Sequence, residues 1–121
     1  PSLWRARINA NGTTASEELV EGIENLQFRY GIDRNAPPAF PSGYIATQGT
    51  ATDVGTTVDQ WRRIGQVQVG LLASSPNRAA AAQASQITPM LLGEVQAPPA
   101  DGRYRAVYES TIALRNRLFG N

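Results

Sequence analysis

The sequence predicts an α+β fold, in which an antiparallel β-sheet of about four or five strands carries one main α-helix on a face. Residues 15–25 have the three- and four-residue apolar spacing of a helix. Residues 2–9 and 101–115 alternate apolar and polar side chains, as strands do. A chain of 121 residues suits one domain with its own core, so we expect a single globular domain over residues 1–121.

The main predicted helix covers residues 15–25. The sequence Thr14-x-x-Glu17 before it fits a capping box, whose two side chains accept backbone N–H groups of the first turn. Gly22 lies within this helix, where a glycine costs roughly 1 kcal/mol relative to alanine. We therefore expect Gly22 to allow a close approach of a neighbouring backbone. The apolar stripe of the helix consists of Leu19, Ile23 and Leu26.

The apolar spacing changes from the helical period to two residues at Leu26. Phe28, Tyr30 and Ile32 follow at this spacing and predict a strand over residues 27–33. Leu26 would then join the helix to the strand. The helix is expected to pack on the sheet that this strand enters.

The other predicted strands are Ser2–Asn9, residues 67–71, an edge strand within 87–95 that tolerates Pro89, and the long strand after Asp101. On this last strand, alternation assigns Tyr108 to the core face and Glu109 to the opposite, solvent face.

The segments between these strands are predicted to lack long regular elements. Residues 35–58 are rich in Pro, Gly and Thr and predict a loop. Residues 56–64 predict one helical turn. Residues 74–86 predict a loop or a short Ala-rich helix opening at Pro76.

The composition removes the commonest catalytic groups. The chain has no His, no Cys and no Lys, which removes the usual general base, the thiol nucleophile, the zinc thiolates and Schiff-base chemistry. No serine lies in a G-x-S-x-G motif, and no G-x-G-x-x-G loop follows a strand. Asp33, Asn35 and Asp53 could offer oxygen ligands to calcium, although loop Asp and Asn residues more often form turns. We expect no catalysis, no cofactor and no metal.

The net charge of +1 gives no reason to expect a nucleic-acid partner. The arginines nevertheless gather near the end of the chain. A solvated strand face is the simpler interpretation of this cluster, and a surface for nucleic acid or for an acidic partner is the alternative. Trp61 is likewise either a core residue or an exposed interface anchor. The candidate partner-contact residues are therefore Trp61, Arg103, Arg105, Arg115 and Arg117.

The stretch ELVEGIENLQFRYGID, residues 18–33, resembles the PilW family, minor pilins of bacterial type IV pili. Three further features match in the expected order: the Asn11-Gly12 turn before the acidic stretch, Trp61 ahead of IGQVQVGLLASS, and the closing DGRYRAVYESTIALRNR. Minor pseudopilins of type II secretion have a similar transition from helix to strand, like the one predicted here within residues 18–33. They are the alternative family.

The resemblance implies a pilin-like head, the C-terminal globular part of a longer minor pilin whose N-terminal membrane helix would precede Pro1. It implies a non-catalytic structural subunit that takes part in assembly and priming at the pilus tip. The implied partners are other minor pilins and a tip adhesin. The implied location is the periplasm and inner membrane before assembly, and the cell-surface pilus tip afterwards. An adhesive or DNA-binding module is the alternative, motivated by the arginine cluster and the long loops.

Overall fold

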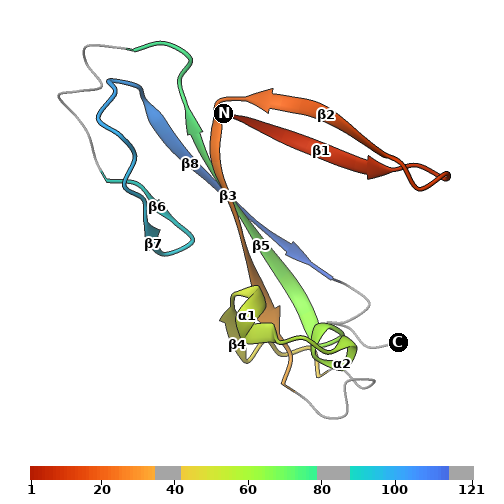
Figure 1. Ribbon diagram of the computed structural model, residues 1–121. Helices are drawn as coiled ribbons and strands as arrows, with labels where there is room; N and C mark the ends of the chain where they lie inside the picture. The colour runs from red at the N-terminus through yellow and green to blue at the C-terminus, as the bar shows by residue number, and fades with distance from the viewer. Residues whose placement is uncertain (35–41, 79–87, 115–121) are drawn as a thin grey trace. The chain divides into compact units, whose positions relative to one another are not determined.

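The computed structural model describes residues 1–34, 42–78 and 88–114 (Figure 1). Strands make up 53% of these residues and helices 8%, so the protein is mostly β. Among the described residues, no helix is long and apolar enough to cross a bilayer. The elements are β1 (Ser2–Ile8), β2 (Thr14–Glu21), β3 (Ile23–Ile32), β4 (Thr47–Gly49), α1 (Ala51–Val54), α2 (Val58–Trp61), β5 (Ile64–Ser74), β6 (Met90–Leu91), β7 (Glu94–Val95) and β8 (Arg105–Ala113).

The strands form three sheets. The first is the antiparallel β1–β2 hairpin, and the third is the antiparallel β6–β7 hairpin. The second has the order β4-β3-β5-β8. The chain divides into two compact units, one made of Pro1–Leu26 and Leu71–Tyr108 and the other of Gln27–Gly70 and Glu109–Asn121. Strands β3, β5 and β8 therefore contribute residues to both units.

The predicted helix over residues 15–25 is wrong, and so is the α+β fold with a helix packed on the sheet. Strands β2 and β3 occupy that segment, and the two described helices have four residues each. Glu17 does not cap a helix. It lies opposite Arg5 in the β1–β2 register and forms an ion pair with it. A cross-strand pair of opposite charge stabilises a sheet. Residues 14–21 therefore pair with β1 and do not form the helix that their apolar spacing predicted.

The turn between β1 and β2 explains why a hairpin forms here. Asn-Gly is a strong hairpin signal because both residues tolerate positive φ. Gly12 has φ 83°, and its N–H donates to the carbonyl of Asn9 at 2.9 Å. The Asn11 side-chain oxygen accepts the N–H of Thr13 at 3.0 Å, and the Asn9 N–H donates to the Thr13 carbonyl at 2.8 Å. The turn predicted at Asn11-Gly12 is confirmed, but it leads into a strand.

Gly22 alone separates β2 from β3. It has φ 82°, a left-handed conformation that other residues rarely adopt. Its N–H donates to the Pro1 carbonyl at 2.8 Å, and its carbonyl accepts the Ser74 N–H at 2.7 Å. A Cβ atom at this position would lie 2.7 Å from the Ser74 carbonyl oxygen. The expected close backbone approach is present, and the change of apolar spacing marks a corner between two sheets instead of a helix end.

The core of the second unit is small. Ile32, Val54 and Ile64 are 2%, 3% and 5% exposed, and Tyr30, Val67 and Leu114 pack against them. Strand β4 extends the sheet by pairing with β3 through Tyr30↔Gly49, Gly31↔Gln48 and Ile32↔Thr47.

Two short helices follow β4, and both begin with a capping box. In α1, Thr50 accepts the Asp53 N–H and the Asp53 side chain accepts the Thr50 N–H; in α2, Thr57 and Gln60 do the same. The helical turn predicted within 56–64 is confirmed as α2. The loop predicted over 35–58 is wrong where β4 and α1 lie, and its residues 35–41 are outside the described part.

Two other predicted strands are confirmed with shifted ends: residues 2–9 contain β1, and residues 67–71 lie inside the longer β5. The single edge strand predicted within 87–95 is wrong, because the two-residue strands β6 and β7 pair with each other there. Pro89 lies outside both of these short strands. The long last strand is β8, which begins at Arg105.

The predicted faces of β8 are wrong in its first half. Tyr108 was assigned to the core, yet it is 61% exposed, while Arg105 and Val107 are partly buried. Alternation predicts which side chains share a face, but not which face is covered. Arg105 lies inward because partner carboxylates neutralise its charge there, as described below.

We predict that Gly22→Ala destabilises the protein more than Gly12→Ala. Both residues have φ close to 80°, but a Cβ at Gly12 meets nothing within 4 Å. Gly12→Ala should therefore cost about 1 kcal/mol through backbone conformation alone. Gly22→Ala should cost at least about 1 kcal/mol more, because the Ser74 backbone must shift. Urea unfolding measures both, and equal losses would contradict a tight corner at Gly22.

Candidate functional site

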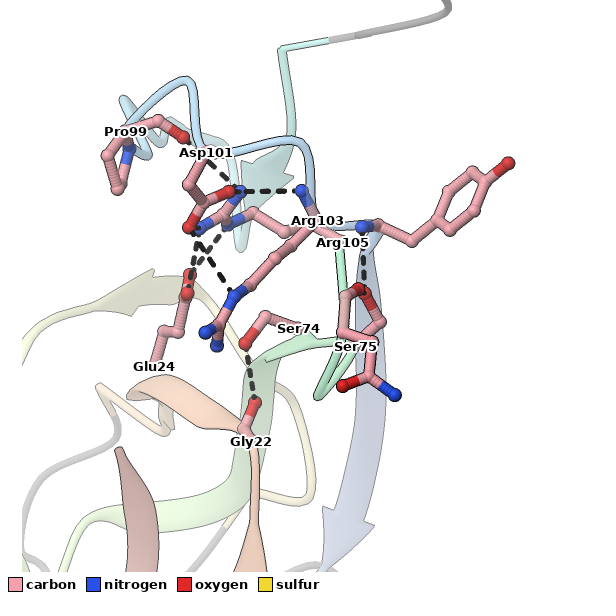
Figure 2. Close-up of polar contacts among 10 residues, drawn as sticks. Gly22, Glu24, Ser74, Ser75, Pro99, Asp101, Arg103 and Arg105 are labelled. Carbon is pink, nitrogen blue, oxygen red and sulfur yellow. Dashed lines mark hydrogen bonds and ion pairs between the residues drawn. The ribbon is translucent and has the colours of Figure 1, made fainter. Parts of the chain in front are cut away.

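The most elaborate polar cluster of the described residues surrounds Arg105 at the start of β8 (Figure 2). The guanidinium binds two carboxylates, each through two hydrogen bonds. Nε and Nη2 donate to Glu24 on β3 at 2.8 and 2.9 Å, and Nη1 and Nη2 donate to Asp101 at 2.8 and 2.9 Å. Nη1 also lies 3.4 Å from the Pro99 carbonyl. The planar fork of an arginine suits this bidentate geometry, which a lysine could not reproduce.

The cluster is largely withdrawn from water. The Arg105 side chain is 6% exposed, and those of Glu24 and Asp101 are 20% and 24% exposed. Burial of a charge is costly unless the charge is paired, and here both carboxylates compensate the arginine. Hydrogen bonds from Arg105 lower the pKa of Glu24 and of Asp101, and hydrogen bonds to Asp101 and Glu24 raise the pKa of Arg105. All three groups are therefore charged around neutral pH.

The loop before β8 is shaped by Asp101. Its Oδ1 accepts the Arg103 N–H at 3.1 Å, and Gly102 between them has φ 72°. The Ser75 Oγ accepts the Tyr104 N–H at 3.0 Å, and the Ser75 N–H donates to the Tyr104 carbonyl at 2.8 Å. These contacts fix the end of β5 and the start of β8 to each other.

Arg103 is the more accessible arginine of the cluster. Its side chain is 36% exposed, and its Nε lies 3.9 Å from Asp101 Oδ2, which is a long ion pair. Arg103 also lines a surface hollow of about 350 Å³. The other lining residues are Pro1, Ser2, Glu21, Gly22, Ser74, Ser75 and Pro76.

Trp61, the aromatic candidate, is packed on one side and partly exposed. Its ring meets Tyr30 edge to face, with centroids 5.1 Å apart, and its indole N–H donates to the Gly55 carbonyl at 2.9 Å. The residue nevertheless remains 39% exposed. It therefore contributes to the packing of the second unit while part of its surface stays exposed.

Of the predicted contact residues, Arg103 and Arg105 belong to one compact unit and Trp61 to the other. The Arg105 side chain is buried and that of Arg103 is half-buried. Arg115 and Arg117 lie outside the described residues. The arginine cluster was interpreted first as a solvated strand face, and for Arg105 this interpretation is wrong.

The loop acids considered for calcium are used in local structure. The buried Asp33 accepts the Ser42 N–H at 2.6 Å, the Ser42 hydroxyl at 2.7 Å and the Gly43 N–H at 3.2 Å. Asp53 caps α1, and the hydrogen bond from the Thr50 backbone lowers its pKa. Asn35 lies outside the described residues. Over residues 1–34, 42–78 and 88–114, no three or more acidic, His or Cys residues gather as a metal site would need.

Comparison with known families agrees with the motifs noted in the sequence. Residues 1–116 match PilW, described as type IV pilus-assembly protein W. The chain belongs to the PilW family. The resemblance carried by residues 18–33 and by the closing strand is thus confirmed. No curated protein and no solved structure matches the chain.

Membership gives the protein a role in type IV pilus assembly. PilW is a family of pilus-assembly components and is not known as a family of enzymes. Membership of this family also indicates that the protein interacts with other pilus components and is located in the cell envelope or the pilus. Because Arg105 on β8 bonds to Glu24 on β3 and to Asp101 in the preceding loop, the cluster holds these three segments together.

We predict that Arg105→Ala lowers the free energy of unfolding by about 2 to 3 kcal/mol. The substitution removes the cation beside Glu24 and leaves Asp101 with only the long ion pair to Arg103. The loss falls below that of a fully buried pair because the carboxylates keep some contact with water. Arg103→Ala is the matched control and should cost less than about 1 kcal/mol, since its ion pair is long and half-exposed. Urea unfolding followed by tryptophan fluorescence measures both. Equal losses would contradict a special role for Arg105.

The stabilisation by Arg105 should also depend on pH. The folded-state pKa values of Glu24 and Asp101 lie below their ordinary values of 4.5 and 3.8. Their contribution is therefore fully present above these ordinary values and is lost as the pH falls through the lower folded-state values. We expect the difference in stability between wild type and Arg105→Ala to shrink from about pH 5 to about pH 3. A difference that stays constant over this range would contradict the pairing.

Proposed function

We propose that this PilW protein is a non-catalytic structural subunit, a minor pilin, that helps to assemble and prime the pilus at its tip through contacts with other minor pilins and a tip adhesin. It would reside in the periplasm and inner membrane before assembly and at the cell-surface tip afterwards. The proposal combines the family match with one structural observation, the distribution of apolar side chains.

That distribution supports a protein that works through its surface. Within the described residues, only five hydrophobic side chains form the buried core. Many more large apolar side chains are exposed, and most of them lie on strands. Extended exposed apolar surface is typical of protein–protein interaction sites. The exposed set comprises Trp4, Ile8, Leu19, Val20, Leu26, Phe28, Tyr44, Val58, Trp61, Met90, Val95, Tyr104, Tyr108 and Ile112.

Strand β8 offers the clearest part of this surface. It is the outer strand of the β4-β3-β5-β8 sheet in the described chain. Tyr108 lies on β8 and Tyr104 directly precedes it, and they are 61% and 49% exposed. Tyrosine is enriched among residues that dominate binding energy, because it brings a large rigid ring and a polar hydroxyl. A partner strand or loop laid along β8 would cover both rings.

Capture of minor pilins from envelope extracts by the immobilised chain tests the proposal. Tyr108→Asp should weaken this capture at least about tenfold, which corresponds to the loss of an interface anchor. Because Tyr108 is exposed, the same change should alter the free energy of unfolding by less than about 1 kcal/mol. Tyr108→Phe, which keeps the ring, serves as the control and should bind nearly as wild type does.

The role in assembly is tested separately in cells. Deletion of the parent gene should remove or strongly reduce surface pili, because a subunit that primes assembly is needed at the start. Normal piliation after deletion would refute the priming role.

A further inference from the structure

We propose, building on the proposed function, that the free edge of β1 binds an extended strand of another pilus component, one in which apolar and acidic residues alternate. The site consists of the backbone of Trp4, Ala6 and Ile8 together with the side chain of Arg7. Addition of a strand to an exposed edge is a common mode of peptide recognition, in which the backbone supplies affinity and alternate side chains supply specificity.

The β1–β2 hairpin is a two-stranded sheet by itself within the described chain (Figure 1). Isolated two-stranded hairpins are marginally stable in water, and unpaired edges attract further strands. Every residue of β2 is exposed, as are the last five residues of β1. A third strand would therefore add backbone hydrogen bonds and cover apolar side chains that now face solvent.

The hydrogen bonds of the turn identify which backbone groups of β1 are free. The Asn9 N–H points toward β2, since it donates to the Thr13 carbonyl at 2.8 Å. Backbone groups of an antiparallel strand alternate in direction, so those of Arg7 and Arg5 also point toward β2. Those of Ile8, Ala6 and Trp4 point to the free edge. The side chains of Trp4 and Ile8 are 59% and 77% exposed, so the same three residues present an apolar row to a partner.

The charge on β1 determines the chemistry of the partner. Arg5 already pairs with Glu17 across the hairpin. Arg7 lies opposite Ala15, and its side chain has no ion pair or hydrogen bond among the described residues. A strand added at the free edge would place one of its side chains next to Arg7 on the same face. An acidic residue fits this position, and apolar residues fit opposite Trp4, Ala6 and Ile8.

A second copy of the chain is a poorer occupant than a different protein. Its β2 would be the acidic strand on offer, with Glu17, Glu18 and Glu21. However, the register shifts between Leu3↔Val20 and Trp4↔Glu18, so Leu19 is an extra residue that bulges β2. A bulge interrupts the even spacing of an edge and hinders pairing. Strand β1 has no extra residue, and its edge stays regular.

The test uses the whole chain and a labelled synthetic peptide, TVEVEVT, with blocked ends. We expect weak binding that decreases with added salt, and no comparable binding of the charge-reversed peptide TVKVKVT. Arg7→Glu should reverse this preference. Equal binding of the two peptides by the wild-type chain would overturn the proposed role of Arg7.

The role of the backbone edge is tested at Ala6. Ala6→Pro removes one outward N–H and leaves the β1–β2 hydrogen bonds intact, because proline is tolerated on an edge whose N–H faces solvent. It should weaken peptide binding at least about tenfold, whereas Ala6→Thr, which keeps the N–H, should bind as wild type does. Circular dichroism checks that both variants are folded. Unchanged binding by a folded Ala6→Pro variant would overturn the edge proposal.

Three further outcomes separate this proposal from its alternatives. Self-association of the chain that Ala6→Pro abolishes would assign the edge to a second copy and overturn the proposed partner. Capture of minor pilins by wild type and equally by Ala6→Pro would uphold the proposed function and refute the edge. Peptide binding without capture of any pilus component would uphold the edge and refute the proposed function.

Discussion

The arrangement of the first compact unit depends on one interaction, the double bidentate pairing of Arg105 with Glu24 and Asp101. A guanidinium keeps its charge when buried, so it can be 6% exposed without a large energetic cost only when acceptors satisfy its donors. The two carboxylates and the Pro99 carbonyl do so. Because these acceptors come from β3 and from the loop before β8, the requirement fixes both segments. The polar cluster thus connects β3 with the loop before β8, in addition to the five buried hydrophobic side chains of the described residues.

Few apolar side chains are buried in the described residues, and many large ones are exposed. Large apolar side chains that a larger core would enclose are exposed on β1, β2, β3 and β8. Gly22 adds a second constraint. Its left-handed conformation lets the chain turn from β2 directly into β3 of the β4-β3-β5-β8 sheet, without a loop. Within the described residues the hairpin pairs with no third strand, and Trp4–Ile8 and all of β2 are exposed. A PilW protein that joins other pilus components needs such surfaces more than it needs an enclosed pocket.

Several elements of this fold were predictable because their signals are local. Alternation in residues 2–9 and after Asp101 predicts β1 and β8, and Asn11-Gly12 predicts the turn that connects β1 to the next element. The helix over residues 15–25 was the main error. The segment satisfies a helical spacing, but pairing of Glu17 with Arg5 and the left-handed Gly22 favour two strands. The candidate site was less predictable: Glu24 and Arg105 are 81 positions apart, and nothing in the local pattern relates them.

By itself, the sequence determined the family, the absence of His, Cys and Lys chemistry, and the positions of most strands, since these depend on residue identity and short-range spacing. Only the tertiary structure decided that residues 14–21 pair with β1 and that Arg105 lies inward while Tyr108 lies outward. The physical reason is that register and facing depend on contacts between distant segments. A two-residue period is the same for either face, and the partner of a charge is set by the fold.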